Sequence, residues 1–403
     1  MTALSDRRAG VRPSQGVRDR LRLAPLGLLM VCVLAAALVG VVVGGSNGTV
    51  AAAPQQARLA DPASGTSDRA ASACTPGFDS DTSSAPWSKA KRASSEKVFQ
   101  QRLASEHPSY VRGRHRRLIF RDQQADNFSQ ALGRVTQTAK QRKAWATFLK
   151  RAQRSVERRG GEFHVVVAPA EWDVYRQDLP SWATKLRGTT SLEKLMAAHP
   201  EIPWIDTRAA LRAAARKNHT YEPLNTHWTP YGGYVAWKMI SACLRLNPEL
   251  ASVAAPPLKR VKIGPNLNEF AGYGVPDGKK ARTSPVYAAK HPRTTITHIP
   301  DGEPVANMPD DTLDLVFLPA RTITKKAQTD KTLLVLRDST GSALSPLWSW
   351  SFEETIQYPH GIGSAFKTKP IRGLVKKFDP DVVLYVITER YLTFPPISQG
   401  STF

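Results

Sequence analysis

From about residue 97 onward, helical spacing of apolar residues alternates with short unbroken apolar runs. Between residues 136 and 159, apolar side chains such as Trp145, Phe148 and Val156 recur at helical spacing among many Lys and Arg, and Gly160 follows. This pattern predicts an amphipathic helix. The next run, FHVVVAP at residues 163–169, is β-branched and ends at proline, which is typical of a parallel strand buried on both faces.

The same alternation continues to the end of the chain. Further helices are predicted at 191–199, 209–217 and 229–247, and further strands at 116–121, 203–207, 312–319, 332–339 and 381–390. Residues 256 to about 293 are rich in Pro, Gly and Lys, and we expect a long irregular insertion there. Strands that alternate with helices predict an α/β domain with a mainly parallel sheet at roughly 97–403.

The first 45 residues predict a membrane anchor. The run 23–45 carries no charge and is long enough to cross a bilayer core of about 30 Å. Residues 1–22 hold six arginines against two aspartates, so we expect a cytoplasmic tail at 1–22, a transmembrane helix at 23–45 and an extracytoplasmic remainder. A cleaved signal peptide is the alternative, but its apolar region is typically about 7–15 residues long.

Residues 46–96 are rich in Ala, Ser, Pro, Asp and Gly and show no sustained period, which predicts a flexible stalk between the membrane and the folded domain. The chain of 403 residues has a formal net charge of +22. Outside the cytoplasm such a charge points to anionic lipid headgroups or anionic cell-surface polymers, and we expect no nucleic-acid partner.

Two cysteines, Cys74 and Cys243, lie beyond the predicted anchor, and Cys32 lies inside it. In an oxidising compartment the exported pair is a candidate disulfide. The sequence cannot show that their Cα atoms come within bridging distance, so two unpaired cysteines are an equal alternative.

Two places in the chain carry candidate catalytic groups. Ser339 follows a predicted strand, together with Asp338 and small residues, so its hydroxyl could stand on a tight turn whose backbone N–H groups bind an oxyanion. An ordinary strand-ending turn is the alternative. Asn225 and His227 are two residues apart and face one side of an extended segment, and Trp228 could wall a pocket beside them. Packing or capping is the alternative role for His227.

In chain order, these motifs resemble the SGNH-hydrolase-like domains of alginate O-acetyltransferases of the AlgJ and AlgX type. The resemblance rests on five segments: THWTP (226–230), Asp338-Ser339, PDVVLYVITER (380–390), HVVVAPAEWDVYRQDLP (164–180) and WIDTRAAL (204–211). It covers roughly residues 115–391, and it implies a three-layer SGNH-like fold at 97–403.

The resemblance also implies roles for individual residues. Ser339 would be the nucleophile and His227 the general base, with Asp338 shaping the turn. Asn225 stands in the place of the family's triad aspartate. The remaining candidates for supporting the site or binding substrate are Trp228, Arg337, Asp206 and Arg390.

Departures from the family pattern leave the strength of catalysis open. Besides Asn225, the glycine before Asp-Ser is Arg337 here, Thr340 replaces phenylalanine, and Glu171 replaces the usual lysine. An Asp-to-Asn change costs about 10⁴ in rate in serine proteases. Another carboxylate, such as Asp338 or Asp206, could support His227, the enzyme could be slow, or the domain could have lost its chemistry.

The function expected on these grounds is that of a single-pass, membrane-anchored extracytoplasmic O-acetyltransferase. It would move acetyl groups through an acetyl-serine onto a cell-surface or secreted polysaccharide, and the family implies a polytopic membrane-bound O-acyltransferase as acetyl donor. A polysaccharide O-acetyl esterase, or a non-catalytic polysaccharide-binding or scaffold protein, is the alternative. No metal spacing or Gly-rich phosphate loop is present, so we expect neither metal nor cofactor.

Overall fold

The structure, a computed structural model, describes Cys74 and residues 86–305, 312–362 and 369–396. The predicted cytoplasmic tail at 1–22 and transmembrane helix at 23–45 lie outside these residues and stay predictions. Within the described ranges, no helix is long and apolar enough to cross a membrane.

A mixed sheet of seven strands forms the centre of the described fold, in the order β4-β3-β11-β9-β10-β8-β7. The first five strands are parallel, and β8 and β7 are antiparallel additions at one edge, so the sheet is mainly parallel as expected. The strands are β3 (Glu162–Ala168), β4 (Trp204–Asp206), β7 (Thr294–His298), β8 (Ala320–Thr324), β9 (Thr329–Arg337), β10 (Phe352–Pro359) and β11 (Val382–Thr388).

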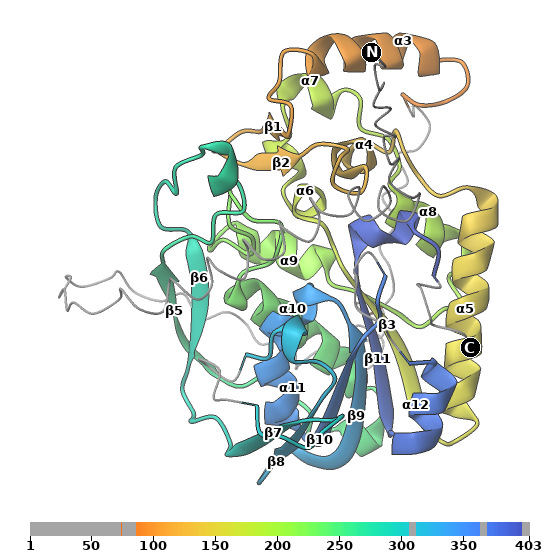
Figure 1. Cartoon of the computed structure of the whole chain (residues 1–403), viewed down its shortest axis with the longest axis vertical. Coiled ribbons are helices and arrows are strands. Elements are labelled where there is room, and N and C mark those ends of the chain that lie inside the picture. The colour runs from red at the N-terminus through yellow and green to blue at the C-terminus, as the bar shows by residue number, and fades with distance from the viewer. Residues whose placement is uncertain (1–73, 75–85, 306–311, 363–368, 397–403) are drawn as a thin grey trace, which may run out of the picture. The chain divides into compact units, whose positions relative to one another are not determined.

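Helices cover both faces of this sheet, which gives the three layers that the sequence predicts (Figure 1). One face packs against α5 (Ala139–Glu157), α8 (Ser191–Ala198) and α12 (Ile371–Phe378), and the other against α9 (Arg208–Ala215), α10 (Pro230–Leu244) and α11 (Ser345–Ser351). Successive residues of β3 show why its run is unbroken: Val165 and Val167 join the first core, whereas Val166 joins the second.

The longest helix begins where the sequence places its cap. Thr138 accepts a hydrogen bond from the backbone N–H of Gln141, whose side chain in turn accepts one from the N–H of Thr138. This capping box satisfies two donors that a helix start would otherwise leave free. α5 then buries Trp145, Phe148 and Val156 against the sheet.

The folded part starts earlier than the predicted end of the stalk at residue 96. Trp87 donates its indole N–H to the carbonyls of Leu132 and Leu186, each at 2.8 Å. The boundary is wrong because a few anchoring side chains such as Trp87 are hidden in an Ala- and Ser-rich composition. The surrounding elements are α3 (Arg92–Leu103), β1 (Tyr110–Arg112), β2 (Leu118–Phe120), α4 (Asn127–Ala131), α6 (Glu171–Val174) and α7 (Ser181–Thr184).

Residues 258–287, which we call the arm, contain regular structure where the sequence predicts an irregular insertion. β5 (Leu258–Gly264) and β6 (Arg282–Tyr287) pair antiparallel, and the chain between them packs Phe270 onto Phe120 of β2 with ring centroids 4.2 Å apart. The strand predicted at 312–319 is also wrong. Its apolar residues form a short 3₁₀ turn at Leu315–Phe317 and a small cluster of their own, and β8 begins only at Ala320.

Cys74 and Cys243 form a disulfide, with their Cα atoms 5.7 Å apart. The bond joins residues 169 positions apart and attaches Cys74 to α10, the helix that follows His227.

We expect the disulfide to stabilise the fold, because it closes a long loop in the unfolded chain. Replacing both cysteines with serine should lower the free energy of unfolding by about 2–4 kcal/mol. Thermal unfolding with and without reductant measures this. Reductant should lower the melting temperature of the parent and leave that of the double variant unchanged. Equal melting temperatures of the two proteins without reductant would contradict the expectation.

Candidate active site

Polar residues gather where the parallel strands end. Because parallel strands have their carboxyl ends at the same edge of a sheet, the residues that follow them meet there. Those residues are Glu171 after β3, Asp338 and Ser339 after β9, His360 after β10, and Glu389 and Arg390 after β11.

Asp338 fixes the turn that carries Ser339. Its carboxylate accepts hydrogen bonds from the backbone N–H and hydroxyl of Thr340, from the N–H of Thr388 at 2.7 Å and from Nε2 of His360 at 3.3 Å. Although burial raises the pKa of Asp338, the hydrogen bonds and the charge of His360 outweigh burial and hold it well below its usual range. The backbone N–H groups of Thr340 and Gly341 are occupied by Asp338, so they are not the free oxyanion donors that the sequence suggests.

Ser339 and His227 lie together, 112 residues apart in sequence, with 2.8 Å between Oγ and Nε2. Ser339 is half-buried, and the side chain of His227 is 31% exposed, so both groups are open to a substrate. Trp228 connects the two segments, because its indole N–H donates to the carbonyl of Thr340 at 2.8 Å. The expectation that Trp228 walls a pocket is therefore wrong. Trp228 is buried and joins the histidine loop to the serine turn.

The start of α10 brings His227 close to this turn. Thr229 caps the helix by accepting from the N–H of Gly232, and Pro230 occupies the first position, as predicted. A side chain at Gly233 would come within 2.9 Å of the Cβ of Ala343, so the helix can approach the serine turn this closely only with glycine there.

Two residues face Nδ1 of His227. Asn225 is in reach at 3.2 Å through Oδ1, as its place in the motif predicts, and Glu269 is closer, with Oε1 at 2.9 Å. The sequence analysis missed Glu269 because it lies on the arm, in a stretch expected to be irregular. The carboxylates suggested as alternatives do not serve His227: Asp338 is occupied as described, and Asp206 pairs with Arg208 at 2.7 Å.

The electrostatics around Glu269 keep it ionised. Burial raises the pKa of Glu269, but the hydrogen bond and charge of His227 and the positive charge of Arg390 outweigh burial and lower the pKa to about 2. Glu171 lies within electrostatic range of both Glu269 and Arg390. Burial raises the pKa of Glu171 to about 8 despite its ion pair with Arg117 at 2.9 Å, so near neutral pH it adds little negative charge beside Glu269.

Arg337 does not face a substrate, which corrects its expected role. Its side chain is fully buried and donates to Gln357, to Ser342 and to the carbonyls of Leu313 and Asp338. Gly341 makes room for it, because a Cβ at residue 341 would overlap Cδ of Arg337.

The remaining predicted residues have modest roles in this geometry. Asp206 receives the backbone N–H and guanidinium of Arg208 and so closes the turn after β4. The guanidinium of Arg390 lies over the ring of Tyr391, 5.1 Å from its centroid, and near the charges of Glu269 and Asp338. Arg390 therefore brings a positive charge close to the two acidic groups beside Ser339 and His227.

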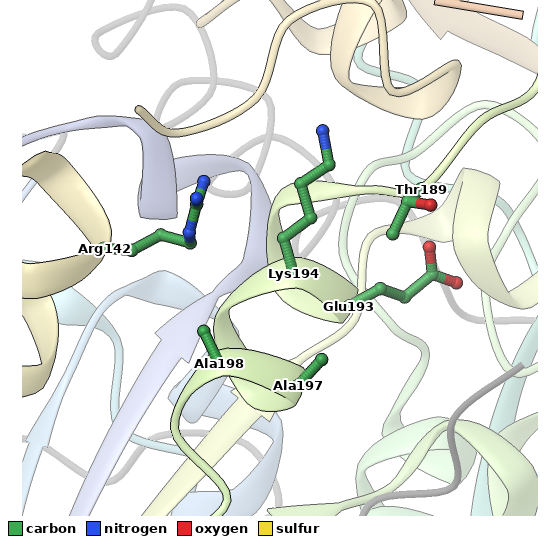
Figure 2. A pocket seen from close by; sticks show the side chains of 6 residues that line it. All are labelled: Arg142, Thr189, Glu193, Lys194, Ala197 and Ala198. Atoms are coloured by element: carbon green, nitrogen blue, oxygen red, sulfur yellow. The ribbon is translucent and has the colours of Figure 1, made fainter. Parts of the chain in front are cut away.

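A hollow of about 460 Å³ lies between α5 and α8, and neither Ser339 nor His227 lines it (Figure 2). Its lining residues are Arg142, Thr189, Glu193, Lys194, Ala197 and Ala198. Burial and the charge of Arg142 lower the pKa of Lys194. Across the described part of the chain, no group of three or more His, Cys, Asp or Glu side chains could hold a metal ion.

Comparison with known families supports the fold and the motifs that lie within the matched stretch. Residues 127–269 match the family model described as the SGNH hydrolase-like domain of acetyltransferase AlgX. The resemblance to the AlgX type is confirmed. The matched stretch is roughly a third of the chain and contains β3, the Asn225–Pro230 motif and Glu269 at its end. No curated protein matches the chain by sequence.

Solved structures with a similar arrangement are distant in sequence. A DHHW family protein from Eubacterium siraeum is 17% identical, with a TM-score of 0.49, over 71% of this chain and 95% of its own. Bacillus cereus PatB1 with a sulfonyl adduct is 13% identical, with a TM-score of 0.46, over 64% and 90%. The O-acetyltransferase domain of Pseudomonas putida AlgJ is 15% identical, with a TM-score of 0.42, over 72% and 93%.

The contact between Arg337 and Gly341 yields a stability prediction. Gly341→Ala should destabilise the protein by about 1–3 kcal/mol, because the buried Arg337 stem cannot move aside. Urea unfolding measures the change. Gly272→Ala is the matched control, since a Cβ there meets no atom within 4 Å. Equal stability of the two variants would mean that Arg337 does not fill the space beside Gly341.

Glu171 yields a prediction about pH. Its folded-state pKa of about 8 lies above the ordinary 4.5, so the folded protein retains a proton that the unfolded chain releases, and this contribution to stability falls as pH rises from about 5 to 8. Glu171→Gln cannot ionise and escapes this loss. Its stability relative to the parent should therefore increase steadily from pH 5 to pH 8.

Urea unfolding of the parent and of Glu171→Gln at several pH values within this window provides the measurement. The exposed Glu353→Gln serves as control, and its difference from the parent should not change with pH. Parallel pH dependence of the parent and Glu171→Gln would show that Glu171 is already ionised at pH 5.

Proposed function

We propose that this chain is a membrane-anchored extracytoplasmic O-acetyltransferase that forms an acetyl-serine at Ser339 and passes the acetyl group to a polysaccharide hydroxyl. The observation that carries the proposal is the 2.8 Å contact between Ser339 Oγ and His227 Nε2 on a half-buried turn. A serine hydroxyl is a weak nucleophile until an adjacent base takes its proton. The match of residues 127–269 to an acetyltransferase family model gives the direction of the chemistry.

In the first half-reaction, Nε2 of His227 takes the proton of Ser339 as Oγ attacks the carbonyl carbon of the acetyl donor. The tetrahedral intermediate collapses, the bond between the acetyl group and the donor oxygen breaks, and the donor leaves with the proton held by His227. In the second half-reaction, a sugar hydroxyl gives its proton to His227 and attacks the acetyl-serine. Collapse of this second intermediate releases the acetylated sugar and returns the proton to Ser339.

The predicted anchor at 23–45 fits this proposal, because it would keep the domain beside a polytopic membrane-bound O-acyltransferase that supplies acetyl groups. The acceptor would be a cell-surface or secreted polysaccharide. The scaffold alternative rested on Asn225 and Arg337. Glu269 now contacts His227, and Gly341 accommodates Arg337, so neither departure argues against a working site.

The test is intact-mass spectrometry of the purified full-length protein in detergent after incubation with an activated aryl acetate. We expect an acetyl adduct that maps to Ser339, that is absent in Ser339→Ala, and that forms at least about 10³-fold more slowly in His227→Ala. Added oligosaccharides that accept the acetyl group would distinguish transfer from hydrolysis.

Two controls match the variants. Ser94→Ala removes an exposed serine on α3, and His298→Ala removes a histidine that also bonds to a carboxylate, Asp301. Both should acylate like the parent. A folded parent that shows neither an adduct nor turnover of the aryl acetate would refute the proposal and favour a binding or scaffold role.

A further inference from the structure

The geometry points to Glu269 as the residue that positions His227, in place of the family's aspartate, whereas Asn225 holds the arm that carries Glu269. This inference rests on the proposed function, because His227 must act as a base for its positioning to matter. The carboxylate that faces His227 thus comes from the arm, and not from the loop before α10.

Both oxygens of Glu269 accept hydrogen bonds. Oε1 lies 2.9 Å from Nδ1 of His227, and Oε2 accepts from the backbone N–H of Thr226 at 2.8 Å. Two acceptors are needed here, so a carboxylate satisfies the site and an amide does not. A carboxylate at Nδ1 fixes the tautomer that leaves Nε2 free to accept a proton, and it stabilises the imidazolium that follows.

Both ends of the Asn225 amide make shorter hydrogen bonds than the 3.2 Å contact with Nδ1 of His227. Its Oδ1 accepts from the backbone N–H of His227 at 2.8 Å, and its Nδ2 donates to the carbonyl of Leu267, on the arm, at 3.0 Å. An aspartate at 225 would place an oxygen against the Leu267 carbonyl and a second negative charge beside Glu269. Asparagine at 225 and glutamate at 269 are therefore compatible with each other, because the amide satisfies the Leu267 carbonyl and the carboxylate satisfies Nδ1 of His227.

Further contacts hold the arm against the histidine loop. The carboxylate of Glu222 accepts from the N–H of Leu267 at 2.6 Å and from Arg282 at 2.9 Å, and the N–H of Glu269 donates to the carbonyl of Leu224 at 3.0 Å. Phe270, the next residue, is fully buried. The position of the Glu269 carboxylate is thus set by contacts on both sides of it.

Three further charged groups lie within electrostatic range of Glu269. Arg390 follows β11, Glu171 begins α6, and Glu222 lies in the same loop as His227, between α9 and α10. Only Glu269 among these acids contacts the imidazole at hydrogen-bonding distance within the described residues.

Acylation of Ser339 by an aryl acetate, followed across pH in the full-length protein, tests the inference. Glu269→Gln should lower the acylation rate by about 10²–10⁴-fold, the upper limit being the Asp-to-Asn effect in serine proteases. Its acid limb should move to lower pH, because the imidazolium loses its anionic partner. Asn225→Asp alone should cost about 10-fold or less, and the double variant should recover at least about 10-fold over Glu269→Gln, since a carboxylate again reaches Nδ1.

Matched controls separate charge from structure. Glu353→Gln makes the same substitution at an exposed site and should act like the parent. Arg282→Ala removes the Arg282–Glu222 ion pair of the arm but keeps the carboxylate at 269. If Glu269→Gln does not fold, Glu269→Asp replaces it, with the charge withdrawn by one methylene, and a smaller rate loss is expected.

A folded Glu269→Gln that acylates at the parent rate with an unchanged pH profile would overturn the inference and leave the proposed function intact. If the parent itself never acylates, the proposed function fails, and NMR of the His227 ring decides about Glu269. The Nδ1–H signal should be present in the parent and in Glu353→Gln and lost or shifted in Glu269→Gln. An identical signal in all three proteins would overturn the inference.

Discussion

The carboxylate of Asp338 holds the ends of three central strands in register, and the candidate site is built around it. It binds the first residues after β9, the last residue of β11 and the histidine that follows β10. Because Ser339 is the next residue in the chain, the place of its hydroxyl is set by the sheet. Trp228 then attaches the histidine loop to the same turn, so one set of contacts positions both Ser339 and His227.

Each of two departures from the family pattern is matched by a second residue that lies near it in space. Arg337 stands where the resembled motif has glycine, and Gly341 leaves the volume that its stem occupies. Asn225 stands where the resembled motif has aspartate, and the carboxylate of Glu269 contacts Nδ1 of His227. Buried polar groups require partners, so a change at one such position is tolerated where a neighbour restores volume or charge. Single positions suggest a degraded site, whereas the contacts supply His227 with a carboxylate partner and Arg337 with space.

The elements with strong periodicity or clear caps could be predicted from sequence, as α5, β3, α10 and β11 illustrate. β10 could not, because Glu353, Glu354 and Gln357 interrupt its apolar run. Gln357 is nevertheless buried, where it accepts from Arg337. A polar residue that looks like a surface position is thus the partner of a buried cation, and only the tertiary structure shows this. The opposite error occurred at 312–319, where apolar residues fill a small cluster outside the sheet.

Ser339 and His227 could be found from sequence because short motifs in a fixed order carry them. Glu269 could not, because it is 42 residues from His227 and its neighbours, rich in Gly, Pro and Lys, give no sign of a buried acid. The two kinds of placement differ in how each residue reaches the site. The serine turn and the loop that Trp228 attaches to it bring the first two residues together, whereas the arm brings the third through its own contacts with Glu222 and Asn225. A local motif can indicate the first kind of placement. The second kind depends on tertiary contacts of the arm, which no short stretch of sequence encodes.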